Sequence, residues 1–192
     1  STYPSLFTEV NYPTSSSYYS GANDAIIGKV DSDGEFLWLR QIGSEGSQGG
    51  SSYYESLGQI SDSFSDIAIG KDGKIYVIGS SNGLQFLGED NNGLNDTLLV
   101  KFDLNGEKEW VKLAGTEFQD WGESIAVDEN DNIYISGRFW DNSTQTGQKI
   151  FLSKYNSKGK LQWNKSLGTN EIESNSNVVV DQEGSIFLSF NS

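Results

Sequence analysis

Internal repetition constrains the fold of this chain more than any other feature of its sequence, because two kinds of unit alternate along the 192 residues. The first unit reads Asp-x-x-x-x-Lys-x-Asp-x-x-Gly-x-x-x-Trp and ends on a glycine. The second unit places two short apolar runs on either side of a turn rich in Asp, Asn and Gly. The first unit recurs at 24–43, 96–115 and 149–168, and the second at 66–79, 124–137 and 177–189. A repeat of this kind predicts an array of similar modules.

Each unit has the composition of a β-hairpin. Its two runs are rich in Ile, Val, Tyr and Phe, and Gly, Asp and Asn between them tolerate the positive φ angles that tight turns need. No ten-residue segment follows a helical period, and the two prolines lie near the N-terminus, at Pro4 and Pro13. Six hairpins give twelve strands, and a four-strand repeat of about 50 residues is typical of propeller blades. The predicted fold is therefore all-β, a β-propeller of four-stranded antiparallel blades.

Composition excludes several classes of function. His, Cys and Met are absent, which removes imidazole bases, Ser-His-Asp and Cys-His nucleophile systems, thiolate metal sites and disulfides. The net charge of −14 has the wrong sign for binding nucleic acid. No apolar run approaches the roughly 18 residues that a membrane-spanning helix needs. The N-terminus shows neither an initiator methionine nor a signal peptide, so we expect a mature product or a fragment. Acidic surface proteins of bacteria that are rich in Ser, Gly and Asn often lack cysteine, so we expect a location outside the cell or at its surface.

The two motifs resemble the bacterial β-propeller repeat called SBBP. The likeness rests on the first unit followed by Gly and then by Ile-Ala-Val-Asp-x-x-x-Asn-Ile-Tyr-x-x-Gly, and it covers residues 24–190 with one long interruption. Residues 7–23 are similar to that family's linker between the second and third strands of a blade. The Gly-x-x-x-Trp element is also similar to quinoprotein propellers, and residues 31–36 to sialidase Asp boxes. The resemblance to SBBP implies a structural repeat of the kind found in secreted and surface proteins, and it implies no single activity.

The order of the units predicts how the chain is divided. If the second unit supplies strands A and B of a blade and the first supplies C and D, the chain holds about three blades. These would be a half-ring, completed by self-association with a second copy or by blades in missing sequence, because closed propellers have about four to eight. The predicted parts are a linker or partial blade at 1–23, a half blade plus long loop at 24–61, blades at 62–115 and 121–168, and a half blade at 174–192.

The B–C and D–A connections share one end of a propeller, which we call the loop end. Two insertions relative to the later repeats fall there, together with large aromatic and acidic residues. Aromatic faces beside carboxylates suit sugar rings, and variable loops on a rigid scaffold are common binding surfaces. The alternative is that these aromatics fill gaps between blades. The candidate ligand-binding residues are Tyr53, Tyr54, Phe86, Phe118, Asp120, Trp121, Trp140 and Asp141.

Two further residue sets have simple interpretations. Trp38, Trp110 and Trp163 occupy one repeat position, so we expect them to pack within the scaffold. The Asp-rich turns have the oxygen density that calcium prefers, although they lack the spacing of an EF-hand and a hairpin turn needs such residues anyway. Calcium is the only cofactor considered, and its candidate ligands are Asp31, Asp33, Asp128 and Asp131.

An enzyme is disfavoured by the residues available. With only two arginines, Arg40 and Arg138, one chain cannot build a three-arginine carboxylate clamp of the sialidase kind. A glycoside hydrolase using paired carboxylates remains an alternative, although no spacing selects a pair. We therefore predict a non-catalytic binding or adhesion module of a secreted or surface protein, with glycan or protein as its ligand. A purely structural repeat scaffold is the other alternative.

Overall fold

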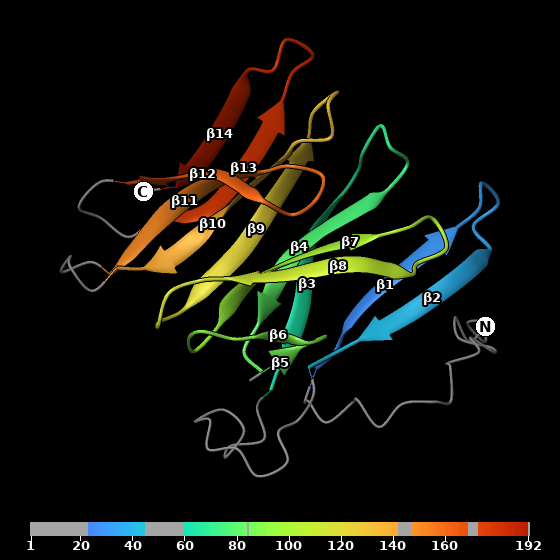
Figure 1. Ribbon diagram of the computed structural model, residues 1–192, viewed down its shortest axis with the longest axis horizontal. Coiled ribbons are helices and arrows are strands. Elements are labelled where there is room, and N and C mark those ends of the chain that lie inside the picture. The colour runs from blue at the N-terminus through green and yellow to red at the C-terminus, as the bar shows by residue number, and fades with distance from the viewer. Residues whose placement is uncertain (1–22, 45–59, 84, 142–146, 169–172, 192) are drawn as a thin grey trace, which may run out of the picture.

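The computed structural model describes residues 23–44, 60–83, 85–141, 147–168 and 173–191. Within these ranges the chain forms fourteen β-strands and no helix, so the all-β class predicted from the repeats is confirmed (Figure 1). The described residues form no helix that is long and apolar enough to cross a membrane. The strands are β1 (Ala25–Val30), β2 (Phe36–Ile42), β3 (Asp62–Ile69), β4 (Ile75–Ser81), β5 (Gln85–Phe86), β6 (Glu89–Asp90), β7 (Asp96–Phe102), β8 (Lys108–Ala114), β9 (Asp120–Val127), β10 (Ile133–Trp140), β11 (Gln148–Tyr155), β12 (Leu161–Leu167), β13 (Ser174–Val180) and β14 (Ile186–Asn191).

Two four-stranded antiparallel sheets form the middle of the molecule. Sheet I contains β3, β4, β7 and β8 in that order, and sheet II contains β9, β10, β11 and β12. The hairpins β1–β2 and β13–β14 form two-stranded sheets, and β5–β6 is a small hairpin between β4 and β7. Four-stranded antiparallel sheets of this kind are consistent with the predicted propeller blades.

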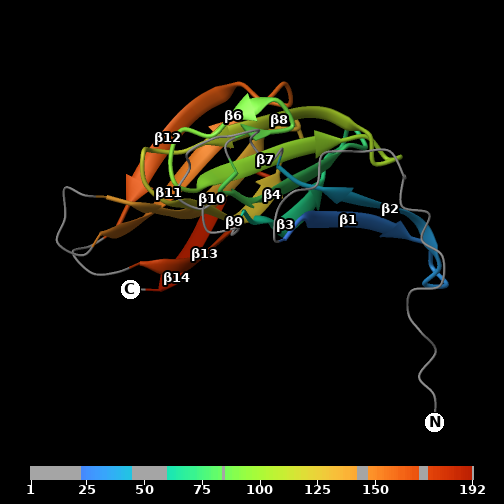
Figure 2. The same ribbon diagram turned by 90° about the horizontal axis from the view of Figure 1, so that it is seen from below.

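The sheets stack in chain order, from β1–β2 at one side of the molecule to β13–β14 at the other (Figure 1). Strand β9 packs against β3, β4 and β7, and strand β13 packs against β9, β10 and β11. Seen from below, the stack is curved (Figure 2). Each sheet therefore covers a face of its neighbour, which places the apolar cores between sheets rather than within one.

The repeated Asp-x-x-Gly sequence builds the hairpin turns. At the β1–β2 turn, Asp31 Oδ1 accepts hydrogen bonds from the backbone N–H groups of Asp33 and Glu35, both at 2.9 Å. Gly34 closes this turn with φ of 88°, a conformation that other residues adopt only with strain. The same side-chain bonds recur at Asp103, Asp128, Asn156 and Asp181.

The repeated Gly-x-x-x-Trp sequence links one sheet to the next. The Trp38 indole N–H donates to the Leu104 carbonyl at 3.1 Å, and the ring lies against Gly106, where any added Cβ would collide with it. Trp110 repeats this contact with the Ser157 carbonyl at 3.2 Å. The glycine of the motif is therefore required by the tryptophan of the preceding sheet, which gives these tryptophans a packing role.

A second device joins the end of one sheet to the start of the next. The Ser44 backbone N–H and hydroxyl both donate to the carboxylate of Asp62, the first residue of β3, each at 2.6 Å. Thr116 donates to Asp120, the first residue of β9, at 2.8 and 2.9 Å. The aspartate that begins β3 or β9 thus accepts hydrogen bonds from the Ser or Thr that follows the last strand of the preceding sheet.

Two interfaces between sheets define the core. The first junction, between β1–β2 and sheet I, contains buried Ile27, Phe86, Val100 and Val111, with Trp38 packed beside them. The second junction, between sheets I and II, has a core of eight buried hydrophobic residues. These are Tyr76, Ile78, Leu99, Ile125, Ile133, Ile135, Phe151 and Tyr155.

The outer faces of the two terminal hairpins carry exposed apolar side chains. Ile26 and Leu37 are each 55% exposed on β1–β2, and Val179 and Phe187 are 55% and 58% exposed on β13–β14. The predicted division of the chain into blades and half blades, and the completion of a ring by a second copy or by further sequence, stay predictions.

Candidate functional site

The start of β9 and the end of β10 bring several candidate residues to one edge of sheet II. The antiparallel register sets Arg138 opposite Trp121 and Phe139 opposite Asp120. The backbone N–H of Trp140 donates to the Gln119 carbonyl at 2.9 Å, which extends the pairing by one residue. The structure thus gathers the residues around 120 and 140, which the sequence separates by about twenty positions, at the loop end.

Trp121 is half-buried beneath a cation. The Arg138 guanidinium lies 4.6 Å from the centre of the Trp121 ring. Its Nε is 3.2 Å from Glu123 Oε1, and Glu123 Oε2 accepts hydrogen bonds from the Ser176 backbone and hydroxyl on β13. The orientation of Trp121 is therefore fixed by a polar network that also fastens β13 to sheet II.

Among the candidate aromatics that the structure describes, Trp140 is the most exposed, with 38% of its surface accessible. Its ring packs on Gly147, which has φ of 80° and no room for a Cβ on that side. The neighbouring Asp141 carboxylate forms an ion pair with Lys149 at 2.9 Å. The loop end of sheet II therefore presents a supported indole face next to a carboxylate.

The other four aromatic candidates do not join this edge in the described part of the chain. Phe86 is fully buried in the first junction, so its prediction as a ligand-binding residue is corrected: the β5–β6 hairpin inserts the ring into the core. Phe118 is half-buried, and its carbonyl accepts hydrogen bonds from Leu94 and Asn95. Tyr53 and Tyr54 lie outside the described residues.

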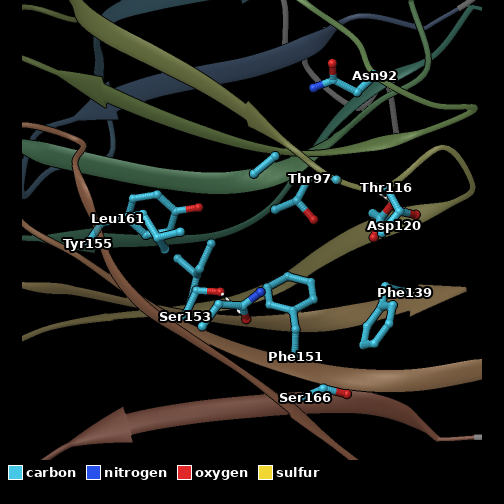
Figure 3. A pocket seen from close by; sticks show the side chains of 14 residues that line it. Asn92, Thr97, Thr116, Asp120, Phe139, Phe151, Ser153, Tyr155, Leu161 and Ser166 are labelled. Atoms are coloured by element: carbon cyan, nitrogen blue, oxygen red, sulfur yellow. Dashed lines mark hydrogen bonds between the residues drawn. The ribbon is translucent and has the colours of Figure 1, made fainter. Parts of the chain in front are cut away.

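A cavity of about 360 Å³ opens in the second junction, next to this edge (Figure 3). One wall comes from sheet I through Thr97, and the opposite wall comes from sheet II through Phe139 and Phe151. Asp120 lines it near the loop end, and Tyr155 and Leu161 lie farther along it. Of the predicted ligand-binding residues that the structure describes, Asp120 lines this cavity.

The cavity lies where three polar residues, Ser153, Asn164 and Ser166, replace apolar residues of the repeat. In sheet I, the opposed pair Val100 and Val111 is buried in the first junction. The corresponding pair in sheet II is Ser153 and Asn164, which hydrogen-bond to each other at 3.0 Å. The next pair along, Leu98 and Leu113, becomes Phe151 and Ser166. These smaller or polar side chains leave the second junction hollow toward its outer edge.

Two carboxylates meet at the end of the cavity. Those of Asp96 and Asp120 both lie against Gly115, and Asp96 Oδ2 accepts a hydrogen bond from the Asn92 backbone at 2.8 Å. Burial, with a smaller contribution from the charge of Asp120, raises the pKa of Asp96 to about 6, although the bond from Asn92 opposes it. Burial also raises the pKa of Asp120, against the two hydrogen bonds from Thr116. One proton is thus retained at this pair more readily than at ordinary aspartates.

The four candidate calcium ligands lie at hairpin turns. Asp31 and Asp128 each use Oδ1 to accept two backbone N–H groups, and Asp131 Oδ1 accepts the Asp72 N–H at 3.1 Å. Asp33 is exposed beside Asp31. Burial acts to raise the pKa of Asp128, but hydrogen bonds from Asn132, Asn130 and Tyr134 outweigh it and lower that pKa.

These turn contacts satisfy carboxylate oxygens without an ion. Across the described ranges, no group of three or more Asp or Glu side chains is arranged to hold a metal. Calcium at the four turn positions stays a prediction.

Sequence reasoning missed most of the cavity. Thr97, Phe151, Ser153 and Asn164 line it, and none was singled out as a candidate. A signal was present in the repeat alignment, since the core valines of one copy become Ser153 and Asn164 in the next. Polar residues at a core position of a repeat indicate a local function or a cavity.

Comparisons with known proteins agree with the fold. Residues 109–138, from β8 through most of β10, match the family model SBBP, described as a beta-propeller repeat. This confirms the resemblance stated from the motifs over that segment. An uncharacterised WD repeat-containing protein of Acanthamoeba polyphaga mimivirus is 27% identical over 117 residues, which is 50% of this chain and 8% of that protein. The regulatory protein FlaEY of Caulobacter vibrioides is 25% identical over 179 residues, 84% of this chain and 17% of that protein.

The chain therefore spans less than a fifth of the length of these two relatives. Together, the repeat match and the WD-repeat relative support a repeat module that binds or scaffolds. Proteins of such repeat families are usually non-catalytic.

Proposed function

We propose that this chain, which carries an SBBP beta-propeller repeat, is a non-catalytic binding module of a secreted or cell-surface protein and that it recognises glycan at its loop end. One observation carries the proposal. Trp121 and Trp140 lie on adjacent strands at one edge of sheet II, where Asp120 begins β9 and the Asp141 carboxylate, paired with Lys149, follows Trp140. An accessible indole beside hydrogen-bond acceptors is the combination that sugar rings use.

Trp140 would make the main contact. Its ring is supported from one side by Gly147 and is 38% exposed, so a sugar C–H face can stack on it without displacing core residues. Trp121 contributes less, because the Arg138 guanidinium occupies one face of its ring. The acidic surface and the absence of cysteine are compatible with a location outside the cell.

The observations favour a binding module over the hydrolase alternative. A glycoside hydrolase needs two carboxyl groups that both reach the scissile bond. The pair that the fold brings together contains Asp96, whose side chain is fully buried and whose Oδ2 holds the Asn92 backbone. A protein ligand at the same aromatic edge is the remaining alternative, and it is an outcome of the test below.

The test measures binding of the chain to an array of bacterial and plant glycans, with Trp140→Ala as the variant. We expect the wild-type chain to bind at least one glycan and the variant to lose at least tenfold in affinity while its thermal midpoint is unchanged within a few degrees. Phe36→Ala is the matched control, because Phe36 is an exposed aromatic, 49% accessible, on the β1–β2 hairpin. Glycan binding that is unaffected by Trp140→Ala would contradict the proposed surface, and no binding to any glycan would leave a protein as ligand.

A further inference from the structure

The second-junction cavity has the size and access of a small-ligand site. Its volume of about 360 Å³ lies near the lower end of the range of ligand pockets, which is about 300–1,000 Å³. Three of its lining residues, Asn92, Thr116 and Ser166, are exposed, so the cavity opens to solvent at its rim. A ligand of one ring can therefore enter without separation of the sheets.

The wall from sheet II is aromatic. Phe139, Phe151 and Ile135 line it, and Phe151 faces the wall formed by sheet I (Figure 3). A saturated ring with an apolar C–H face stacks favourably on such side chains. Phe139 points into this junction, whereas its neighbour Trp140 points to the other face of sheet II, because successive residues of a strand alternate between faces.

The wall from sheet I contains a hydroxyl that no protein group uses. Thr97 is 2% exposed, and among the described residues its Oγ1 has no hydrogen-bond partner. Figure 3 shows this side chain directed into the cavity, across from Phe151. The equivalent residues of the other copies are Ala25 and Ile150, so the repeat itself does not require a hydroxyl here. A buried hydroxyl without a hydrogen-bond partner is unfavourable, and a ligand that hydrogen-bonds to it would remove this cost.

The charges of the lining select against ionic ligands. Among the described residues, neither a lysine nor an arginine lines the cavity, which disfavours phosphates, carboxylates and sialic acids. Its one carboxylate is Asp120, whose Oδ2 already accepts two hydrogen bonds from Thr116. The other polar groups are neutral hydroxyls and amides, including Ser153 and Asn164, which suit a ligand with several hydroxyls of its own.

We infer that the second-junction cavity is a subsite for a single neutral pyranose ring, which stacks on Phe151 and hydrogen-bonds to Thr97. The inference rests on the proposed glycan recognition and adds to it a subsite on the face of sheet II opposite Trp140. Neither Thr97 nor Phe151 belongs to the loop-end surface, so the two sites can be separated by mutation.

The test measures binding of the methyl glycosides of glucose, galactose, mannose and N-acetylglucosamine to the full chain by NMR titration. Thr97→Val keeps the shape of the side chain and removes only the hydroxyl. We expect at least one glycoside to bind and Thr97→Val to weaken it about three- to tenfold, the loss of one neutral hydrogen bond. Chemical-shift changes should include Thr97 and Phe151.

Ser136→Ala is the matched control. Ser136 is also fully buried with no hydrogen-bond partner for its Oγ among the described residues, but it does not line the cavity. Removing it should leave glycoside affinity unchanged, whereas a general effect on folding would change both variants.

Three outcomes would overturn the inference. The first is equal affinity of Thr97→Val and wild type, and the second is a failure of all four glycosides to bind. The third is binding of methylamine that competes with the glycoside, which would make the site one for cations. In each case the proposed function is judged separately, because glycan-array binding that depends on Trp140 would still support it.

Discussion

The two junctions of sheet I are built from the same repeat positions, yet one is a solid core and the other is partly hollow. In the first junction, Val100 and Val111 are buried with Phe86, which the β5–β6 hairpin inserts from outside the repeat. In the second junction, Ser153 and Asn164 occupy the equivalent positions and a cavity of about 360 Å³ lies beside them. The same backbone thus supports either a packed interface or a binding cavity.

The difference shows which parts of the repeat are structural and which can vary. The turn aspartates, the glycine under each tryptophan and the acid that holds the preceding sheet recur at both junctions. The outer residues of the C and D strands differ, and so does the filling of the first junction by Phe86. A β-repeat can therefore acquire a site by substituting two inward-facing residues, without loss of the contacts that order its sheets.

The largest expected effect comes from emptying the first junction. Phe86→Ala should lower the free energy of unfolding by about 3–5 kcal/mol, the cost of removing a fully buried aromatic ring and leaving a cavity. Urea denaturation measures this. Phe36→Ala, at an exposed position, should change it by less than about 1 kcal/mol. A decrease of less than about 1 kcal/mol in the free energy of unfolding for Phe86→Ala would contradict the view that the first junction is more tightly packed than the second.

The carboxylate pair at the second junction should make stability depend on pH. Because the pKa of Asp96 is about 6 in the folded chain and its ordinary value is 3.8, the folded state holds its proton more tightly than the unfolded state. This contribution to stability is complete below pH 3.8 and is lost as pH rises through 6.

Asp96→Asn removes this dependence while it keeps an oxygen for the Asn92 N–H. At pH 8 the variant should be more stable than wild type by about 1–3 kcal/mol, since one pKa unit corresponds to about 1.4 kcal/mol. Below pH 4 the difference should vanish. Asp33→Asn, at an exposed turn position, is the control with no such pattern. A constant difference at every pH would contradict the assignment to Asp96.

Converting the second junction into the first should trade binding for stability. The double variant Ser153→Val with Asn164→Val restores the valine pair of sheet I, and filling the cavity should add about 0.5–2 kcal/mol to the free energy of unfolding. The same variant should no longer bind methyl glycosides. Thermal unfolding and the NMR titration measure the two effects. A variant that is less stable yet still binds would show that the valine pair does not account for the difference.

The smallest effect concerns the third copy of the repeat. There Lys149 replaces the aspartate of the other two copies and pairs with Asp141. Lys149→Gln should cost no more than about 1 kcal/mol and should change little with pH near 6, because a partly exposed ion pair contributes little. At Gly115 the carboxylates of Asp96 and Asp120 lie together, whereas in the third copy a lysine stands in place of the first aspartate and no such repulsion is expected. A pH profile of stability that resembles that of the Asp96 site would contradict this interpretation.

Sequence reasoning was reliable where one residue type has one geometric consequence. The hairpins followed from Asp-x-x-Gly turns, and the scaffold role of Trp38 followed from its fixed spacing, because each needs only local contacts or the repeat period. Phe86 could not be assigned in this way. Its ring looks like a loop aromatic in the sequence, and only the path of β5–β6 carries it into the core.

The cavity as a whole could not be predicted from the sequence, although the polar residues Ser153 and Asn164 at core positions of the repeat were a signal for it. It depends on side chains from two sheets, and the sequence does not state which copy faces which. Thr97 has an ordinary neighbourhood in the chain and becomes unusual only because its hydroxyl faces Phe151 from the next sheet. The loop-end residues Trp121 and Trp140 were named from the sequence, and their glycan-binding role stays a prediction.

The most direct test of the account is a crystal structure of the chain grown with a saturating concentration of the methyl glycoside that binds best in the titration. The account predicts density for one pyranose ring between Phe151 and Thr97 in the second junction, within hydrogen-bond distance of the Thr97 hydroxyl, and a first junction filled by Phe86. Density for the sugar only on the outer surface, or a second junction closed by Phe151 with no sugar inside, would contradict it.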